Sequence, residues 1–597
     1  MRPPTLQYFY LEKPMILLIL ITFISVFLWI GKGDFYTKGE PREASVAVSM
    51  LEKNQWVLAT EYADEIAYKP PLTHWLMAVF SMPRGKVTPL SARLPSALAF
   101  MGLIVTSFLF FGKNLKFQDS FLAALILLTA FELHRAAMTA RVDMLLTFLI
   151  VWALTRLFRW EERKKLKGFP VWVVLLQGLA VLTKGPVGIV LPMLVFGIYL
   201  LFLKYNFWKI AGKLIPVALA SLVLPAIWYF GAYQMGGKSF LDVVWAENFG
   251  RFLGSQNLPI HYALGHEEGW WYNCLTLAAG FIPWTILLFI SLFGLNYLKK
   301  IPSVKSLWNS FIQQDKIKLF SVIAAIVIIV FYSIPLSKRS VYLMPAYPFI
   351  SIFIAQYVFF VRENKPKLFS GFTVFIAAIA CIVSLIVLLI VIFPVIDPVL
   401  LASHFVKRQQ TLDEISATWQ VLRGFSILHV LLLLVLLYSI FVYIKHFRKK
   451  NYLKILYATI AVYLALNLVL DGIFIPAYAD GISVKPYAKA LQKNYQFGEN
   501  DLFVTNDLLK YGGNMYGLNF YLHNKFNNFE KEQPSEGFFL VGKNDFEKVS
   551  QEYGKEYKFT LLEEYNNKTR DGERVILLFT FDRHCEGDSP KQSSEKQ

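Results

Sequence analysis

Long apolar runs, separated by short polar segments, constrain this chain more than any other feature of its sequence. Runs of about 17–25 residues recur over roughly the first 475 residues, and this is the length that an α-helix needs to cross a bilayer. The pattern predicts a polytopic, all-α membrane protein with about thirteen spans, near 14–30, 95–112, 119–134, 143–159, 170–183, 186–203, 212–231, 272–296, 318–334, 342–361, 368–394, 426–444 and 453–475.

The composition supports this class and excludes others. Hydrophobic residues make up 55% of the 597 residues and charged residues only 17%, whereas soluble domains carry about a quarter charged residues. The formal net charge of +18 does not indicate nucleic-acid binding, because the basic residues lie in short clusters between apolar runs. No spacing of the three cysteines suggests a disulfide or a thiol centre.

The basic clusters predict the orientation of the chain. Every second loop is short and rich in Lys and Arg, for example "RWEERKKLKG", "RENKPK" and "KHFRKKNYLK", as loops on the cytoplasmic side are. The first apolar run is long and no small-residue cleavage site follows it, so we expect an uncleaved span. The N-terminus is then cytoplasmic and the C-terminus lies on the outer side.

Three domains follow from these patterns. Residues 1–475 form the membrane domain, which includes a structured outer loop over 31–94 that Pro41 can open as the first turn of a helix. Residues 476–585 predict a small α/β domain, with "DLFVTND" and "RVILLFTF" as strands and "NDFEKVSQEYGKEY" as an amphipathic helix. Residues 586–597 predict a disordered tail.

Basic residues on the outer side are unexpected, because orientation rules disfavour them there. One interpretation is contact with lipid headgroups. The other is an anionic ligand, which so many cations at one face favour. These residues are Arg42, Lys69, Arg93, Arg135, Arg141, Lys184, Arg251, Lys338 and Arg339.

Carboxylates accompany these cations. Glu40 and Glu43 flank Arg42, and Asp143 follows Arg141 by two residues; Asp143 could equally cap the next helix. Glu247, one turn before Arg251, could form an ordinary helical ion pair. Cations and carboxylates together suit transfer of a sugar from a polyprenyl phosphate, because cations stabilise the leaving phosphate and a carboxylate accepts the proton of an acceptor hydroxyl.

Several motifs carry a resemblance to a known family. They are "GEPREA", "YKPPLTHW", "SARLPSAL", "ARVDMLLTF", "LTKGPVGIVLP", "ENFGRF", "HEEGWWYN", "GFIPW" and "SKRSVYLMPAYPF", over about residues 30–350. In order and spacing they resemble the bacterial aminoarabinose transferases and protein mannosyltransferase-like membrane glycosyltransferases, which have the GT-C fold. The resemblance implies an undecaprenyl-phosphate sugar donor, a bacterial inner-membrane location and inverting transfer to lipid A, another glycan or a protein. A polyprenyl-lipid binding or transport protein without transferase activity is the alternative.

The resemblance also implies site residues. The family motif Asp-Glu-x-Arg reads "GEPR" here, so Gly39 stands in place of the Asp, while Glu40 and Arg42 match. We therefore expect Glu40 or Asp143, which matches the second acidic position, to be the catalytic carboxylate. The family's Glu-Lys-Pro-Pro reads "YKPP", which retains Lys69 as a ligand of the donor phosphate but has Tyr68 in place of the Glu.

The same resemblance implies further phosphate ligands: Arg42, Arg251, His266, Lys184 and Lys338. In the aminoarabinose transferases the Glu before the Lys and a later His can bind a divalent metal, so a zinc or magnesium ion at His266 is an open expectation. His266 could instead donate to the phosphate directly or cap the next span.

Overall fold

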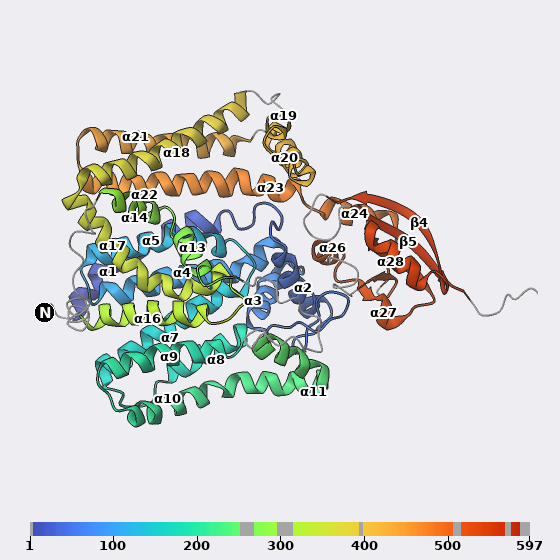
Figure 1. Ribbon diagram of the computed structural model, residues 1–597, viewed down its shortest axis with the longest axis horizontal. Coiled ribbons are helices and arrows are strands. Elements are labelled where there is room, and N and C mark those ends of the chain that lie inside the picture. The colour runs from blue at the N-terminus through green and yellow to red at the C-terminus, as the bar shows by residue number, and fades with distance from the viewer. Residues whose placement is uncertain are drawn as a thin grey trace, which may run out of the picture.

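The computed structural model describes residues 4–250, 268–294, 315–392, 398–424, 426–498, 500–505, 515–567 and 575–584. Most of these residues are helical, and the helices lie side by side in a bundle from which a small sheet projects at one end (Figure 1). In the first half of the chain the helices are α1 (Pro4–Thr22), η1 (Phe23–Phe27), α2 (Gly39–Glu52), α3 (Leu72–Ser81), η2 (Met82–Arg84), α4 (Pro89–Gly112), α5 (Phe117–Thr129), α6 (Phe131–Ala137), α7 (Val142–Lys164), α8 (Val171–Lys184), α9 (Val187–Phe202), α10 (Phe207–Ser221), α11 (Val223–Trp245) and η3 (Ala246–Gly250).

The second half of the bundle continues in the same way. Its helices are α13 (Tyr272–Gly280), α14 (Trp284–Gly294), α16 (Lys316–Ser333), η5 (Ser340–Ala346), α17 (Tyr347–Asn364), α18 (Pro366–Ile392), α19 (Pro398–Ser403), α20 (Gln409–Leu422), α21 (Ile427–Arg448), α22 (Tyr452–Val469), η6 (Leu470–Phe474) and α23 (Ile475–Gly481). A helix lies within each apolar segment that the sequence nominated.

By length and composition, seven of the described helices can cross a membrane, or up to nine if two bent helix pairs each count as one span. Two shorter apolar helices, α8 and α9, add to these. The multi-span membrane class is therefore confirmed, whereas the count of thirteen and the orientation of the termini stay predictions. The span expected at 212–231 differs, because α10 and α11 together continue the helical run to Trp245.

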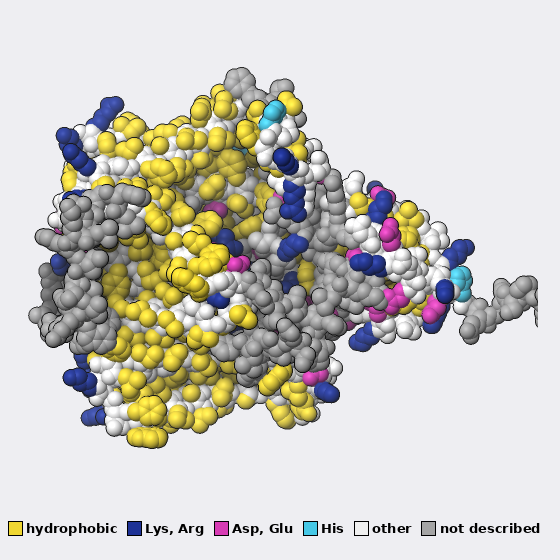
Figure 2. Space-filling model, in the orientation of Figure 1, with side chains coloured by type: hydrophobic (Ala, Val, Ile, Leu, Met, Phe, Trp, Pro, Cys, Tyr) yellow, Lys and Arg dark blue, Asp and Glu magenta, His cyan; other side chains and the backbone are white. Residues whose placement is uncertain are grey.

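The surface of the bundle has the character that a bilayer requires. A broad hydrophobic area covers the helices in Figure 2, with Lys and Arg side chains at its left margin and charged side chains over the sheet at the opposite end. Large apolar side chains stay exposed along outer helices, for example Trp208 at 77% and Ile227 at 68%. Such an area would be costly in water and is satisfied by lipid.

The C-terminal sheet region, residues 485–584, has mixed α/β structure. Its elements are α24 (Lys485–Asn494), β1 (Leu502–Val504), α26 (Tyr516–Tyr521), β2 (Phe526–Asn528), α27 (Phe529–Glu532), β3 (Glu536–Gly542), α28 (Lys543–Tyr553), β4 (Tyr557–Asn566) and β5 (Val575–Arg583). The strand order is β2-β1-β3-β5-β4, with β1 parallel to β2 and β3, and with β5 antiparallel to β3 and β4. The two predicted strands and the predicted amphipathic helix are present; the domain boundaries stay predictions.

The sheet region shares its core with the loop that follows α2. Tyr62 and Ala63, both almost fully buried, belong to the same apolar cluster as Leu518, Phe526 and other residues of the sheet region. The Tyr62 ring packs edge-on against Phe526, with ring centroids 5.5 Å apart. Loop 59–67 is therefore a structural part of the sheet region, although more than 400 residues of chain separate the two.

Candidate functional site

Several nominated residues of the described part of the chain lie near α2, which contacts α26 of the sheet region at the right end of the bundle in Figure 1. Helix α2 begins at Gly39 with Pro41 in its first turn, as predicted. Lys69 precedes two prolines, which favour extended backbone before them, so its side chain enters the site just ahead of α3. Asp143 lies in the first turn of α7, and Lys184 is the last residue of α8, where a helix favours a cation.

Glu40 lies in what we call the Arg93 cluster, which consists of Glu40, Arg93 and the backbone around them. Its carboxylate accepts hydrogen bonds from the Arg93 Nε at 2.7 Å and from the backbone N–H groups of Ala140 (3.2 Å), Tyr36 (3.2 Å) and Thr37 (3.3 Å). Glu40 is fully buried and Arg93 is 2% exposed. Every Glu40 oxygen is thus held by fixed donors, which is the arrangement of a structural ion pair.

Arg93 is positioned by its own helix. Thr88 and Ser91 form a capping box at the start of α4, so the helix begins at a fixed point and Arg93 lies on its second turn. The guanidinium also donates to the carbonyl oxygens of Ile30 (3.0 Å) and Asp34 (2.8 Å). The sequence nominated Arg93 only as one of many outer cations, and nothing local marks its partner 53 residues earlier.

Glu43, one helical turn after Glu40, has different partners. Its carboxylate pairs with the Lys69 ammonium, accepts a hydrogen bond from the His74 Nε2 at 2.9 Å and lies 3.5 Å from the Arg42 guanidinium. These side-chain cations hold the pKa of Glu43 well below its usual range, although burial alone would raise it. Burial in turn lowers the pKa of Lys69 to about 8, even with Glu43 beside it.

Asp143 forms a second pair beside the first. Its carboxylate accepts a hydrogen bond from the Lys184 ammonium at 2.5 Å and lies 3.5 Å from the Arg141 Nε. The residue at the N-cap position of α7 is Arg141, so the interpretation of Asp143 as a helix cap is wrong. We call Glu43, Lys69, Arg42, His74, Asp143, Arg141 and Lys184 the cavity cluster.

Two glycines allow close approaches of other groups beside the cations of the cavity cluster. A Cβ on Gly39 would lie 2.8 Å from a terminal nitrogen of Arg141, so the missing side chain leaves room for that guanidinium. Gly185 has a φ of +97° and a Cβ there would lie 2.3 Å from the Asn248 side-chain oxygen. The chain therefore turns sharply right after Lys184, next to the cavity described below.

A cavity of about 370 Å³ opens between the two lysines. We call it the lysine cavity. Lys69 and Lys184 line it, while Glu43 and Asp143 lie behind them, almost completely buried. Most of the remaining wall is apolar or aromatic: Tyr68, Pro70, Pro186, Val187, Val190, Phe331, Tyr332, Pro335 and Tyr342. One carboxylate, Glu247, also lines the cavity. Two cations against one carboxylate, in a largely apolar wall, suit an anionic group attached to a hydrophobic chain.

Aromatic rings and a second carboxylate surround Arg42. Its guanidinium lies 4.9 Å from the Tyr68 ring and 5.8 Å from the ring of Tyr516, which belongs to α26 of the sheet region. Burial raises the pKa of the nearby Glu61 to about 8; Arg42 opposes this shift and Glu43 adds to it. Glu61 thus carries a proton at neutral pH for most of the time.

The remaining nominated residues are divided. Lys338 is buried and donates to the Glu268 carbonyl at 2.8 Å, beside the cavity wall but not in it. Arg251 and His266 lie outside the described residues, so the expected Glu247–Arg251 ion pair stays a prediction. Sequence reasoning missed His74, although it stands five residues after Lys69 in "YKPPLTHW", and it missed Tyr516, for which no local signal exists.

The expected metal depends on His266 and therefore stays a prediction. Among the described residues, no group of three His, Cys, Asp or Glu side chains converges. The donor set in this part of the chain does not fit a divalent ion, because Tyr68 supplies no carboxylate and Glu43 is already paired with cations.

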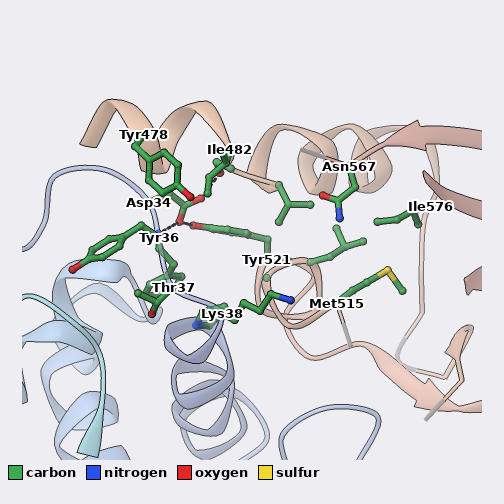
Figure 3. Close-up of a pocket in the computed structure, with 16 residues that line it drawn as sticks. Asp34, Tyr36, Thr37, Lys38, Tyr478, Ile482, Met515, Tyr521, Asn567 and Ile576 are labelled. Atoms are coloured by element: carbon green, nitrogen blue, oxygen red, sulfur yellow. Dashed lines mark hydrogen bonds between the residues drawn. The ribbon is translucent and has the colours of Figure 1, made fainter. Parts of the chain in front are cut away.

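A second cavity, of about 360 Å³, lies between loop 34–41, α23 and the sheet region. Figure 3 shows Tyr521 pointing from α26 toward Asp34 at one side of it. The Asp34 carboxylate accepts hydrogen bonds from the hydroxyls of Tyr521 and Ser483 and from the Phe35 N–H at 2.7 Å. We call this second cavity the junction cavity. Among the described residues, no nominated site residue lines it, so the junction cavity is distinct from the lysine cavity.

Comparisons with known proteins agree with the resemblance. The family model for dolichyl-phosphate-mannose-protein mannosyltransferases matches residues 68–230. An uncharacterized protein of Aquifex aeolicus (strain VF5) is 28% identical over 418 residues, which cover 68% of this chain and 76% of that protein. The undecaprenyl phosphate-alpha-4-amino-4-deoxy-L-arabinose arabinosyl transferase of Shewanella sediminis (strain HAW-EB3) is 22% identical over 58% of this chain and 60% of its own length.

A solved structure is similar over almost the whole chain. ArnT from Cupriavidus metallidurans, in a crystal structure bound to undecaprenyl phosphate, superposes with a TM-score of 0.65 at 18% identity and covers 94% of this chain and 97% of its own. At this identity the likeness establishes the fold.

Proposed function

We propose that this chain, which belongs to the GT-C membrane glycosyltransferases of the aminoarabinose transferase and mannosyltransferase type, transfers a sugar from an undecaprenyl-phosphate-linked donor. The acceptor lies at the periplasmic face of the bacterial inner membrane and is lipid A, another glycan or a protein. The names of the arabinosyl transferases and the lipid in the ArnT structure support this donor. The acceptor and the sugar are the open parts of the proposal.

One observation carries the proposal: the lysine cavity presents two ammonium groups inside a largely apolar wall. A polyprenyl phosphate has the matching composition, with a charged phosphate at the end of a hydrocarbon chain. The phosphate binds between Lys69 and Lys184, and the chain extends along Val187, Val190 and Phe331. Glu43 and Asp143 lie behind the lysines and hold them in place before the lipid arrives.

The cations have a direct chemical role in this reaction. Transfer breaks the bond between the sugar C1 and the phosphate oxygen, and the acceptor oxygen forms a new bond to C1. The phosphate gains a negative charge as it leaves, so fixed cations bind it more strongly in the transition state than in the donor. Arg42 and Arg141 add positive charge at the same end of the cavity cluster.

Of the two carboxylates that the sequence nominated, we assign the acceptor-side role to Asp143. Glu40 is fully buried, and its carboxylate is held by Arg93 and backbone donors, so it has no lone pair directed at a substrate. Asp143 pairs with a lysine that lines the cavity. Asp143 lies behind Lys184 and does not line the cavity, so it reaches the acceptor only when Lys184 turns from it to the lipid phosphate. With a hydroxyl acceptor, Asp143 then accepts the released proton; with a phosphate acceptor, which is already ionised, it orients the sugar.

Three further residues belong to the proposal. We assign Arg251 and His266 to the donor phosphate on the motifs "ENFGRF" and "HEEGWWYN" alone. Lys338 acts on the site through its position beside the cavity wall, where it fixes the Glu268 backbone.

The test is transfer of radiolabelled sugar from a synthetic undecaprenyl-phosphate donor to an envelope extract, with purified protein in nanodiscs. Lys69→Ala should lower the rate by about 10²–10³-fold, because it removes one cation from the developing charge. Lys53→Ala is the matched control, since Lys53 pairs with the exposed Asp64 away from the cavity. Equal rates for Lys69→Ala and the unaltered protein would contradict the site, and binding of the lipid without transfer from any donor would favour the transport alternative.

A further inference from the structure

Glu43 is the one carboxylate of the cavity cluster that touches Lys69, and the sequence motifs gave it no role. Its side chain is only 3% exposed and does not line the lysine cavity, whereas Lys69, 12% exposed, does. Glu43 therefore acts on any ligand of the cavity through Lys69 rather than by contact.

His74 fixes the direction of this carboxylate. The imidazole lies on the first turn of α3, is 1% exposed and contacts the Glu43 Oε2 at 2.9 Å, while the Oε1 faces Lys69. The carboxylate is thus held on one side by the imidazole and points its other oxygen at the cavity wall. Arg42 lies near the same Oε1 atom at 3.5 Å, so the lysine is not the sole cation available to it.

The geometry points to Glu43 as a positioning residue of the donor site: it keeps the buried Lys69 protonated in the empty cavity and releases it to the incoming lipid phosphate. This inference rests on the proposed function only in taking a lipid phosphate as the ligand. The carboxylate competes with the phosphate for Lys69, yet without it the buried lysine would lose its proton near neutral pH. Glu43 therefore weakens binding slightly at low pH and sustains it at high pH.

Other charged groups around Lys69 do not replace this one. Burial lowers the pKa of Lys69 to about 8, Arg42 and Arg141 lower it further, and Glu43 opposes them more than Asp143 does. An opposite charge in direct contact shifts a pKa by about 1–3 units. The charged groups that face Lys69 come from Glu43 and Arg42 on α2, Arg141 and Asp143 at the start of α7, Lys184 at the end of α8 and Glu247 in the cavity wall.

The experiment measures equilibrium binding of radiolabelled undecaprenyl phosphate to the full-length protein in nanodiscs between pH 6 and pH 10. The unaltered protein should lose affinity above about pH 8, where Lys69 deprotonates. In Glu43→Gln the midpoint of this loss should move down by about one pH unit or more. At pH 8.5 the variant should bind about tenfold more weakly, and at pH 6 at least as tightly as the unaltered protein.

Three variants keep the test decisive. Glu43→Asp retains the charge and should restore the midpoint. Lys69→Arg has a side chain that stays protonated, so its affinity should stay constant up to pH 10. Glu52→Gln, on the same helix and also paired with a histidine, His523 at 3.0 Å, should leave the midpoint unchanged.

The outcomes separate this inference from the proposed function. The same alkaline midpoint in Glu43→Gln and in the unaltered protein would overturn the role of Glu43. If Glu43→Gln does not fold, a midpoint near pH 8 that persists in Lys69→Arg overturns it equally. Because binding is the readout, a protein that transfers no sugar can still show the shift, and a protein that transfers sugar can still lack it.

Discussion

Helix α2 carries two buried glutamates one turn apart, and they serve two regions with opposite properties. Glu40 belongs to the Arg93 cluster, where backbone N–H groups and one guanidinium occupy both oxygens. Glu43 belongs to the cavity cluster, where side-chain cations are its partners and one of them lines an opening. Both carboxylates are almost fully buried.

The difference shows what distinguishes a structural ion pair from a site. Fixed donors leave no charge to exchange, so the Arg93 cluster ties together α2, α4 and the loop between α6 and α7. Flexible cations beside a cavity can change partners when an anion enters. A neighbouring cavity, rather than burial or charge, distinguishes the cavity cluster from the Arg93 cluster.

The largest expected effect would be in the Arg93 cluster. Glu40→Gln leaves the Arg93 guanidinium buried without its counter-charge, which costs about 3–5 kcal/mol of folding free energy. Thermal unfolding in detergent should show this loss, while any protein that remains folded keeps its ability to bind undecaprenyl phosphate. Glu52→Gln, whose partner His523 is 48% exposed, should cost less than about 1 kcal/mol. A stable Glu40→Gln protein without transfer activity would reverse the assignment of the two regions.

A medium effect is expected from changes to the aromatic side chains that lie against Arg42 and Arg93. Arg93 lies near Phe35 and Tyr36, in the loop before α2, whereas Arg42 lies near Tyr68 and near Tyr516 of the sheet region. Tyr516→Leu removes one cation–π contact, worth about 0.5–2 kcal/mol, and should lower kcat/KM about 2–30-fold. It should also lower the melting temperature, because the Tyr516 ring packs edge-on against Tyr62. Phe35→Leu should lower the melting temperature while kcat/KM of the folded protein stays unchanged. The same phenotype in both variants would mean that the two clusters are not functionally distinct.

The smallest effect is expected at Glu61, a third buried carboxyl group, which is mostly protonated at neutral pH. Its pKa of about 8 means that the folded chain holds a proton there between about pH 4.5 and pH 8, which the unfolded chain releases. The contribution of Glu61 to the free energy of unfolding therefore falls as the pH rises through that window. Glu61→Gln should match the unaltered protein at pH 5 and melt about 2 °C or more higher at pH 8.5. Equal melting temperatures at both pH values would show that Glu61 is charged like its neighbours.

Much of the architecture could be predicted from sequence. Hydropathy located the helices of the bundle, composition located the mixed sheet region, and the motifs indicated a resemblance with which the family model and the similar proteins agree. These features depend on patterns a few residues long or on recurring motifs. The exact spans are harder: α11 continues past 231 to Trp245, and a kink at Gly237, where φ is +53°, interrupts it.

The site was predicted in outline but not in its pairings. Lys69, Lys184, Asp143 and Arg42 do lie together, and their motifs nominated them. Glu40 was nominated for matching a motif, yet its partner Arg93 is set by how α2 and α4 pack. The contact between Glu43 and Lys69 likewise depends on how distant segments pack. Tyr516, which lies near Arg42, comes from the C-terminal sheet region. Pairings of this kind depend on tertiary contacts that no local pattern records.

The burial of Tyr62 in the core of the sheet region has a consequence for biosynthesis. Its hydroxyl contacts the backbone of Met515, 453 residues later. At a translation rate of about 5–20 residues per second, loop 59–67 waits roughly 20–90 s for the segment that covers it. During that interval Arg42 has only one of its two aromatic neighbours, so a newly made chain stays incomplete until its last hundred residues have emerged.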